Sequence, residues 1–124
     1  MMAMAIAVTM APTNSKAVVY LGIAVDQSTS ISVADFATQI SAYQTALAST
    51  IPTDGSVGVG LWSFGSSVTQ HYATNLIDSA ADLTDLVNAV AGITRSGATA
   101  LGPAIETAAA SILAAGGAGD TFVI

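Results

Sequence analysis

The sequence contains no cysteine, and only two of its 124 residues are basic. Without thiols there is no disulfide, no thiolate zinc site, no iron–sulfur cluster and no cysteine nucleophile. Lys16 and Arg95 stand against eight acidic residues, which gives a formal net charge of −6. Because no stripe of basic side chains is available to neutralise phosphates, nucleic acids and anionic membrane surfaces are poor candidates as partners.

Long uninterrupted apolar runs are missing as well. Residues 1–8 are apolar but are soon followed by polar residues, and residues 100–115 contain Pro103 and Glu106. Neither run reaches the length of about 20 apolar residues that spans a bilayer, so we expect no membrane insertion. Residues 1–16 begin like the apolar region of a secretion signal but lack its basic start. They are either a signal-peptide remnant or an additional edge segment of the sheet.

Recognisable catalytic motifs are also absent. The sequence has no Gly-x-x-x-x-Gly-Lys phosphate loop, no Gly-x-Ser-x-Gly elbow and no His-Glu-x-x-His zinc motif. Its one histidine, His71, lies in an expected strand without a second imidazole or a serine at a recognisable nucleophile spacing. We therefore expect a protein that is not an enzyme and assign His71 no role.

Apolar side chains, in contrast, make up 52% of the chain, with 8% charged residues and a mean hydropathy of +0.68. Burial of that much apolar surface offsets the entropy lost on folding, which excludes a disordered chain. A length of 124 residues suits one domain. We assign this domain to residues 17–124 and treat residues 1–16 as a separate segment.

Hydrophobic spacing predicts alternating strands and helices. Residues 17–25 form a continuous apolar run, typical of a central parallel strand buried on both faces. The order of elements predicts an α/β fold, a Rossmann-like three-layer sandwich with a mostly parallel central sheet and one antiparallel edge hairpin. After the first strand we expect a helix between Ser32 and Pro52, a hairpin over 56–64 and 68–73, helices after Ser79 and from Leu101 to Gly116, and a strand over 120–124.

The loop after the first strand carries the strongest candidate site. Asp26, Ser28 and Ser30 place a carboxylate and two hydroxyls at alternate positions. These hard oxygen ligands suit Mg²⁺, Ca²⁺ or, as a substitute, Mn²⁺. In doubly wound sheets such a loop also lies where ligands bind, outside the carboxyl ends of the strands. The alternative is that these residues only cap the following helix.

This pattern resembles the von Willebrand factor type A domain, whose metal-ion-dependent adhesion site uses Asp-x-Ser-x-Ser after the first strand. The resemblance extends from about Val18 to Ile124. In that family a Gly-x-Thr in a second loop supplies another metal-coordinating hydroxyl, and Gly97-Ala98-Thr99 matches it. The resemblance therefore implies a metal site formed by Asp26, Ser28, Ser30 and Thr99.

The sequence departs from the family pattern at two points. Thr29 replaces the usual glycine between the serines. The family's third metal loop, with its aspartate, and the C-terminal strands of a full domain would lie beyond Ile124, so we expect the fold to lack them. Asp26 is the only carboxylate among these four residues, so the site is expected to bind a dication with a dissociation constant of about 1 mM or weaker. Tighter binding would require another acid, such as Asp120 or one from a neighbouring subunit.

The resemblance implies a noncatalytic binding module whose bound cation accepts a partner protein's carboxylate. The signal-like N-terminal segment and a composition rich in Ser, Thr and Ala but poor in Lys indicate a secreted or surface-attached bacterial protein. The alternative is a self-assembling structural subunit that uses the same fold as a metal-free scaffold. Its motivation is the open sheet edge and the uncovered apolar face that missing C-terminal elements would leave.

Overall fold

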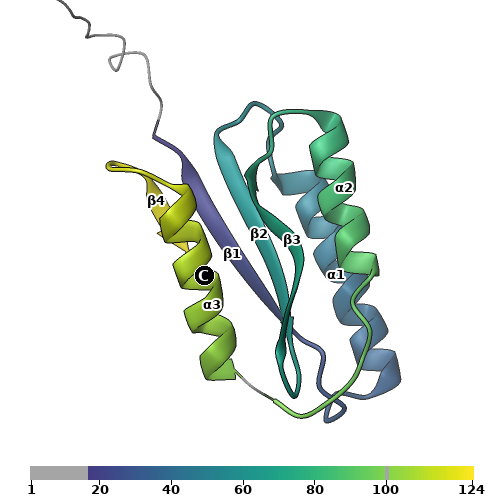
Figure 1. The fold of residues 1–124 in the computed structure, drawn as a ribbon. Helices are drawn as coiled ribbons and strands as arrows, with labels where there is room; N and C mark the ends of the chain where they lie inside the picture. The colour runs from purple at the N-terminus through teal and green to yellow at the C-terminus, as the bar shows by residue number, and fades with distance from the viewer. Residues whose placement is uncertain (1–16, 100) are drawn as a thin grey trace, which may run out of the picture.

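The structure is a computed structural model that describes residues 17–99 and 101–124. The expected segment 1–16 lies outside the described residues. Helices cover both faces of a four-stranded sheet, with α1 and α2 on one face and α3 on the other (Figure 1). The elements are β1 (Val19–Asp26), α1 (Val33–Thr50), β2 (Val57–Phe64), β3 (Val68–Leu76), α2 (Ala80–Ala91), α3 (Leu101–Ala115) and β4 (Thr121–Val123).

The strands lie in the order β3-β2-β1-β4, which places β1 in the interior of the sheet. β1 pairs in parallel with β2 along its whole length and with β4 over Val19–Leu21, whereas β2 and β3 form an antiparallel hairpin. The predicted mostly parallel sheet with one antiparallel edge hairpin is thus confirmed. β2 and β4 lie on opposite sides of β1, so the strand order reverses at β1, beside its carboxyl end.

Alternation along the strands separates two apolar layers. Odd-numbered residues such as Ile23 and Val25 on β1 pack toward α1 and α2, in a cluster that also contains Leu61. On the opposite face Tyr20 and Trp62 pack against α3. The observed layers agree with the predicted three-layer sandwich.

Serine residues cap the N-termini of two helices, each bonded to the amide three residues later. The Ser32 hydroxyl accepts a hydrogen bond from the Asp35 amide, and the Ser79 hydroxyl accepts one from the Asp82 amide, each at 3.1 Å. Each serine therefore satisfies an amide that the first turn of its helix leaves unpaired. In the part of the chain that the structure describes, no helix is long and apolar enough to cross a membrane.

The third helix forms where it is predicted, and its buried stripe contains two alanines and one isoleucine rather than all of its large apolar residues. Ala104, Ala108 and Ile112 are buried, whereas Leu101 and Ile105 are about half exposed, at 51% and 44%. Small residues face the sheet here because a Cβ atom at Gly22 of β1 would lie only 3.4 Å from the Ala108 side chain. Close approach of helix and strand leaves little room for large side chains on that stripe.

Candidate metal centre

The candidate site lies at the carboxyl edge of the sheet. Asp26 is the last residue of β1 and pairs with Phe64, the last residue of β2. The side-chain amide of Gln39 on α1 donates a hydrogen bond to the backbone carbonyl oxygen of Asp26 at 2.9 Å, and this bond anchors the end of the strand. The loop after Asp26 therefore leaves from a fixed point beside the reversal of strand order.

The structure brings three of the predicted ligand residues together on this loop. The Asp26 carboxylate accepts a hydrogen bond from the Ser28 amide at 2.8 Å, which forms a tight turn. The hydroxyl oxygens of Ser28 and Ser30 lie 2.8 Å apart. Ser28 is only 1% exposed, so the protein interior fixes its side chain. Ser32, rather than any of these three residues, caps α1.

Thr99 lies on the loop between α2 and α3, which the structure brings to the same edge. Both the amide and the hydroxyl of Thr29 donate to the carbonyl oxygen of Gly97, at 2.9 and 3.2 Å. Thr99 follows Gly97 by two residues and is exposed. Within the described ranges, no hydrogen bond joins Thr99 to Asp26, Ser28 or Ser30. Its role as a metal ligand stays a prediction.

The donor set fits a hard dication. An octahedral Mg²⁺ ion has oxygen ligands at 2.0–2.1 Å, so two adjacent ligands lie about 2.9 Å apart. The separation of 2.8 Å between the Ser28 and Ser30 hydroxyls is close to that spacing. No cluster of three or more histidine, aspartate or glutamate side chains suited to a metal occurs among residues 17–99 and 101–124. The charge at the site therefore comes from Asp26, which fits weak binding.

Three contacts at this edge were missed in the sequence because they depend on the fold. Ser66, at the turn of the β2–β3 hairpin, accepts a hydrogen bond from the Ala98 amide at 3.0 Å. Arg95, which the sequence places in a loop, donates through its guanidinium to the carbonyl oxygens of Thr29 and Ile31. Its rarity was the one available signal, since it is one of two cations in the chain.

Asp120 does not lie at this edge. Its carboxylate oxygens accept hydrogen bonds from the amides of Val18 and Gly117, each at 2.8 Å. These two bonds hold the pKa of Asp120 below its usual range, and the bond from Val18 has the larger effect. Since Asp120 precedes β4 beside the amino end of β1, the eight residues of β1 separate it from Asp26, a span of roughly 25 Å. Asp120 therefore cannot be the additional acid that tighter binding would require.

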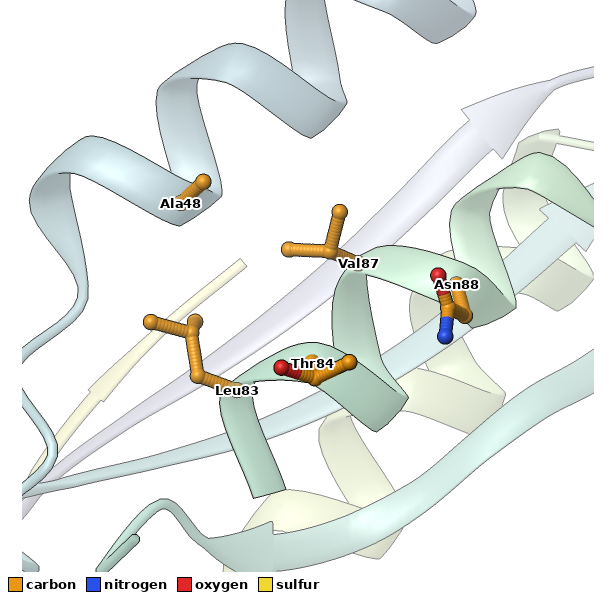
Figure 2. A pocket seen from close by; sticks show the side chains of 5 residues that line it. All are labelled: Ala48, Leu83, Thr84, Val87 and Asn88. Carbon is orange, nitrogen blue, oxygen red and sulfur yellow. The ribbon is translucent and has the colours of Figure 1, made fainter. Parts of the chain in front are cut away.

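One hollow on the surface lies away from the candidate site. It has a volume of about 190 Å³ and lies between α1 and α2 (Figure 2). The lining side chains include no carboxylate and no histidine; they are Ala48, Leu83, Thr84, Val87 and Asn88. Because Ala48 lies near the carboxyl end of α1, this hollow is remote from the loop that follows β1. Its lining therefore supplies no titratable acid or base.

His71 has a partner that its sequence spacing does not reveal. Its Nε2 atom lies 2.7 Å from the hydroxyl of Ser63, a residue of β2 that is completely buried. The strand register shifts between Leu61 and Trp62, so that His71 is the extra residue of a β-bulge and turns toward Ser63. Complete burial keeps the serine from reaching a substrate, so the pair is structural.

This pair predicts a pH dependence of stability. Burial lowers the pKa of His71 from its ordinary value of 6.5. As the pH falls through 6.5 the unfolded chain binds a proton before the folded chain does, so the free energy of unfolding should decrease. Urea unfolding at pH 7.5 and 5.5 checks this, with His71→Gln as the comparison. An equal decrease in both proteins would exclude His71 as the source.

Comparison with known proteins gives a consistent result. A family model for the von Willebrand factor type A domain matches residues 21–119. A search of curated proteins finds no significant relative.

Several solved structures are similar in fold. The vWF domain of the type V pili tip protein Mfa5 from Porphyromonas gingivalis gives a TM-score of 0.71 at 18% identity, over 88% of this chain and 37% of that chain. The pilus adhesin SpaC from Lactobacillus rhamnosus GG gives 0.64 at 19%, over 86% and 14%. Proximal thread matrix protein 1 from the mussel byssus, with a zinc-occupied MIDAS motif, gives 0.60 at 17%, over 77% and 25%. This chain thus spans less than two fifths of each.

Proposed function

This chain belongs to the von Willebrand factor type A domain family, and we propose that it is a noncatalytic adhesion module that uses a divalent cation to bind a partner protein. One observation carries the proposal. The Asp26 carboxylate and the hydroxyls of Ser28 and Ser30 lie on one fixed loop at the carboxyl edge of the sheet, where two hydroxyl oxygens are 2.8 Å apart. Thr99 is proposed as a further ligand from the neighbouring loop.

The partner group that fits this site is a carboxylate. A dication held by Asp26 keeps a net positive charge, because hydroxyls and waters bring no formal charge. A carboxylate from the partner would fill an open coordination position and supply part of the missing negative charge. Mg²⁺ fits the hydroxyl spacing best, since the larger Ca²⁺ ion separates adjacent ligands by about 3.4 Å.

The proposed location is outside the cell, secreted or at a bacterial surface. Similar folds occur in a pilus tip protein and a pilus adhesin, and a mussel byssus protein with this fold carries zinc at its MIDAS motif. At identities of 17–19%, these structures establish only that the fold is similar. The ligand and location of this chain are therefore part of the proposal.

Replacing the one carboxylate of the site tests the proposal. Asp26→Asn should abolish Mn²⁺ binding, because it removes the only formal negative charge among the three residues on this loop. The wild-type chain should bind with a dissociation constant of about 1 mM or weaker, measured from free Mn²⁺ by electron paramagnetic resonance. Competition with Mg²⁺ then gives the affinity for that ion.

Asp35→Asn is the matched control. Asp35 lies in the first turn of α1, where it bonds Ser32, so the variant loses the same charge near the same loop. It should retain Mn²⁺ binding. Equal binding by wild type and Asp26→Asn would refute the metal site.

A second candidate is the metal-free, self-assembling subunit. Its supporting observation is that Val123 of β4 and the following Ile124 are large apolar side chains that are about half exposed. β4 also pairs with β1 on one side, and within the described ranges no strand pairs with its other side. Sedimentation of the metal-free samples separates the two candidates, because this one requires association at micromolar concentration.

A further inference from the structure

Six hydrogen bonds join the loop over 27–31 to the loop over 95–97. Two run between backbone groups, from the Ser96 amide to the Gln27 carbonyl at 2.7 Å and from the Thr29 amide to the Gly97 carbonyl at 2.9 Å. Side chains make the others, and Arg95 contributes two of them. We call the loop over 27–31 the metal loop. Its conformation is thus set largely by a segment more than sixty residues away in sequence.

Arg95 spans the part of the metal loop that contains Ser30. Its Nη2 atom donates to the carbonyl oxygen of Thr29 at 2.8 Å, and its Nε atom donates to the carbonyl oxygen of Ile31. These two carbonyls belong to the peptide groups on either side of the Ser30–Ile31 peptide. A guanidinium presents its donors in a rigid planar fork, so both peptide groups are held in one relative orientation.

We propose that Arg95 is a positioning residue for the metal site, and this inference rests on the proposed function. By fixing the backbone around Ser30, Arg95 keeps the Ser30 hydroxyl 2.8 Å from the hydroxyl of the buried Ser28. The two ligands then need no rearrangement when the ion arrives. Groups that orient metal ligands typically change metal affinity by about 10-fold to 100-fold when they are removed.

The charge of Arg95 acts in the opposite direction. A guanidinium next to the metal loop repels a dication, so charge alone predicts tighter binding once Arg95 is neutralised. Loss of positioning predicts weaker binding. The sign of the change in affinity therefore distinguishes the two effects, and a purely structural role would change the melting temperature without changing affinity in the folded protein.

Two substitutions separate positioning from charge. Arg95→Lys keeps the charge, but an ammonium group is a point donor that cannot hold both carbonyls in a fixed fork. Arg95→Gln removes the charge as well. Both variants should bind Mn²⁺ at least about 10-fold more weakly than wild type, at a temperature where each is folded by circular dichroism. Lys16→Gln, which removes the other positive charge of the chain, controls for net charge and should bind as wild type does.

Hydrogen exchange on the metal-free protein supplies a readout that does not depend on the ion. The amides of Thr29 and Ser96, which join the two loops, should exchange faster in both Arg95 variants, while the Asp82 amide at the start of α2 should be unchanged. Unaltered or tighter Mn²⁺ binding in Arg95→Lys would overturn the inference, and so would unaltered exchange. If wild type binds no Mn²⁺, the proposed function fails, and the exchange rates alone decide whether Arg95 holds the loop. If Arg95→Gln fails to fold, Arg95→Lys decides.

Discussion

Trp62→Ala is expected to lower the free energy of unfolding by about 3–5 kcal/mol. Trp62 is 1% exposed, and its indole packs with Tyr20, Ala108 and Ile112 between the sheet and α3. It is the largest side chain in that layer, and its ring also lies over Gly60, where a Cβ atom would collide with it. Because small domains are stable by only about 5–15 kcal/mol, the variant should be close to unfolding at room temperature.

Urea unfolding followed by circular dichroism measures this loss. The control is Leu113→Ala, on the helix against which Trp62 packs. Leu113 lies on α3 but is 58% exposed, so its truncation should change the free energy of unfolding by less than about 0.5 kcal/mol. A loss below about 1 kcal/mol for Trp62→Ala would show that α3 is not held by this side chain.

Gly97→Ala is expected to disturb both stability and metal binding. Gly97 has a φ of +80°, and a Cβ atom there would lie 2.6 Å from the backbone nitrogen of Ser66. The substitution combines backbone strain of about 1–3 kcal/mol with a collision that separates the hairpin turn from the loop of Thr99. We expect Mn²⁺ affinity to fall at least about 10-fold, because Gly97 also accepts both hydrogen bonds from Thr29.

Gly119→Ala is a matched control for the strain. Gly119 has a φ of +89° but nothing lies within 4 Å of the Cβ atom that the substitution would add. It should therefore show the strain without the collision and should leave Mn²⁺ binding as in wild type. Equal losses of stability and affinity in the two variants would mean that the contact between Gly97 and Ser66 has no role at the site.

The sequence was sufficient for those features that depend on neighbours along the chain. The helix caps at Ser32 and Ser79 were predictable because a cap and the amide it satisfies are three residues apart. The grouping of Asp26, Ser28 and Ser30 was predictable for the same reason, since one short loop carries all three. The mostly parallel sheet with one antiparallel hairpin followed from the alternation of strands and helices, which permits few topologies.

Features that depend on tertiary contact were not predictable. Arg95 meets Thr29 and Ile31 across more than sixty residues, and nothing in the spacing of the sequence marks that contact. His71 reaches Ser63 only because a bulge shifts the strand register by one residue. The stripe of α3 that is buried was likewise set by the closeness of Gly22 rather than by the spacing of the larger apolar residues.

The position of β1 in the sheet has a consequence for the order in which the chain can fold. β1 comes first among the strands that the structure describes, yet Val18, the residue just before it, is bonded to Asp120, 102 residues later in the sequence. Contacts so distant in sequence close large loops and form slowly, and chains emerge from the ribosome at about 5–20 residues per second. One edge of β1 therefore remains unpaired for several seconds after β1 itself has been synthesised. During that interval the unpaired edge of this apolar strand is open to chaperones and to aggregation.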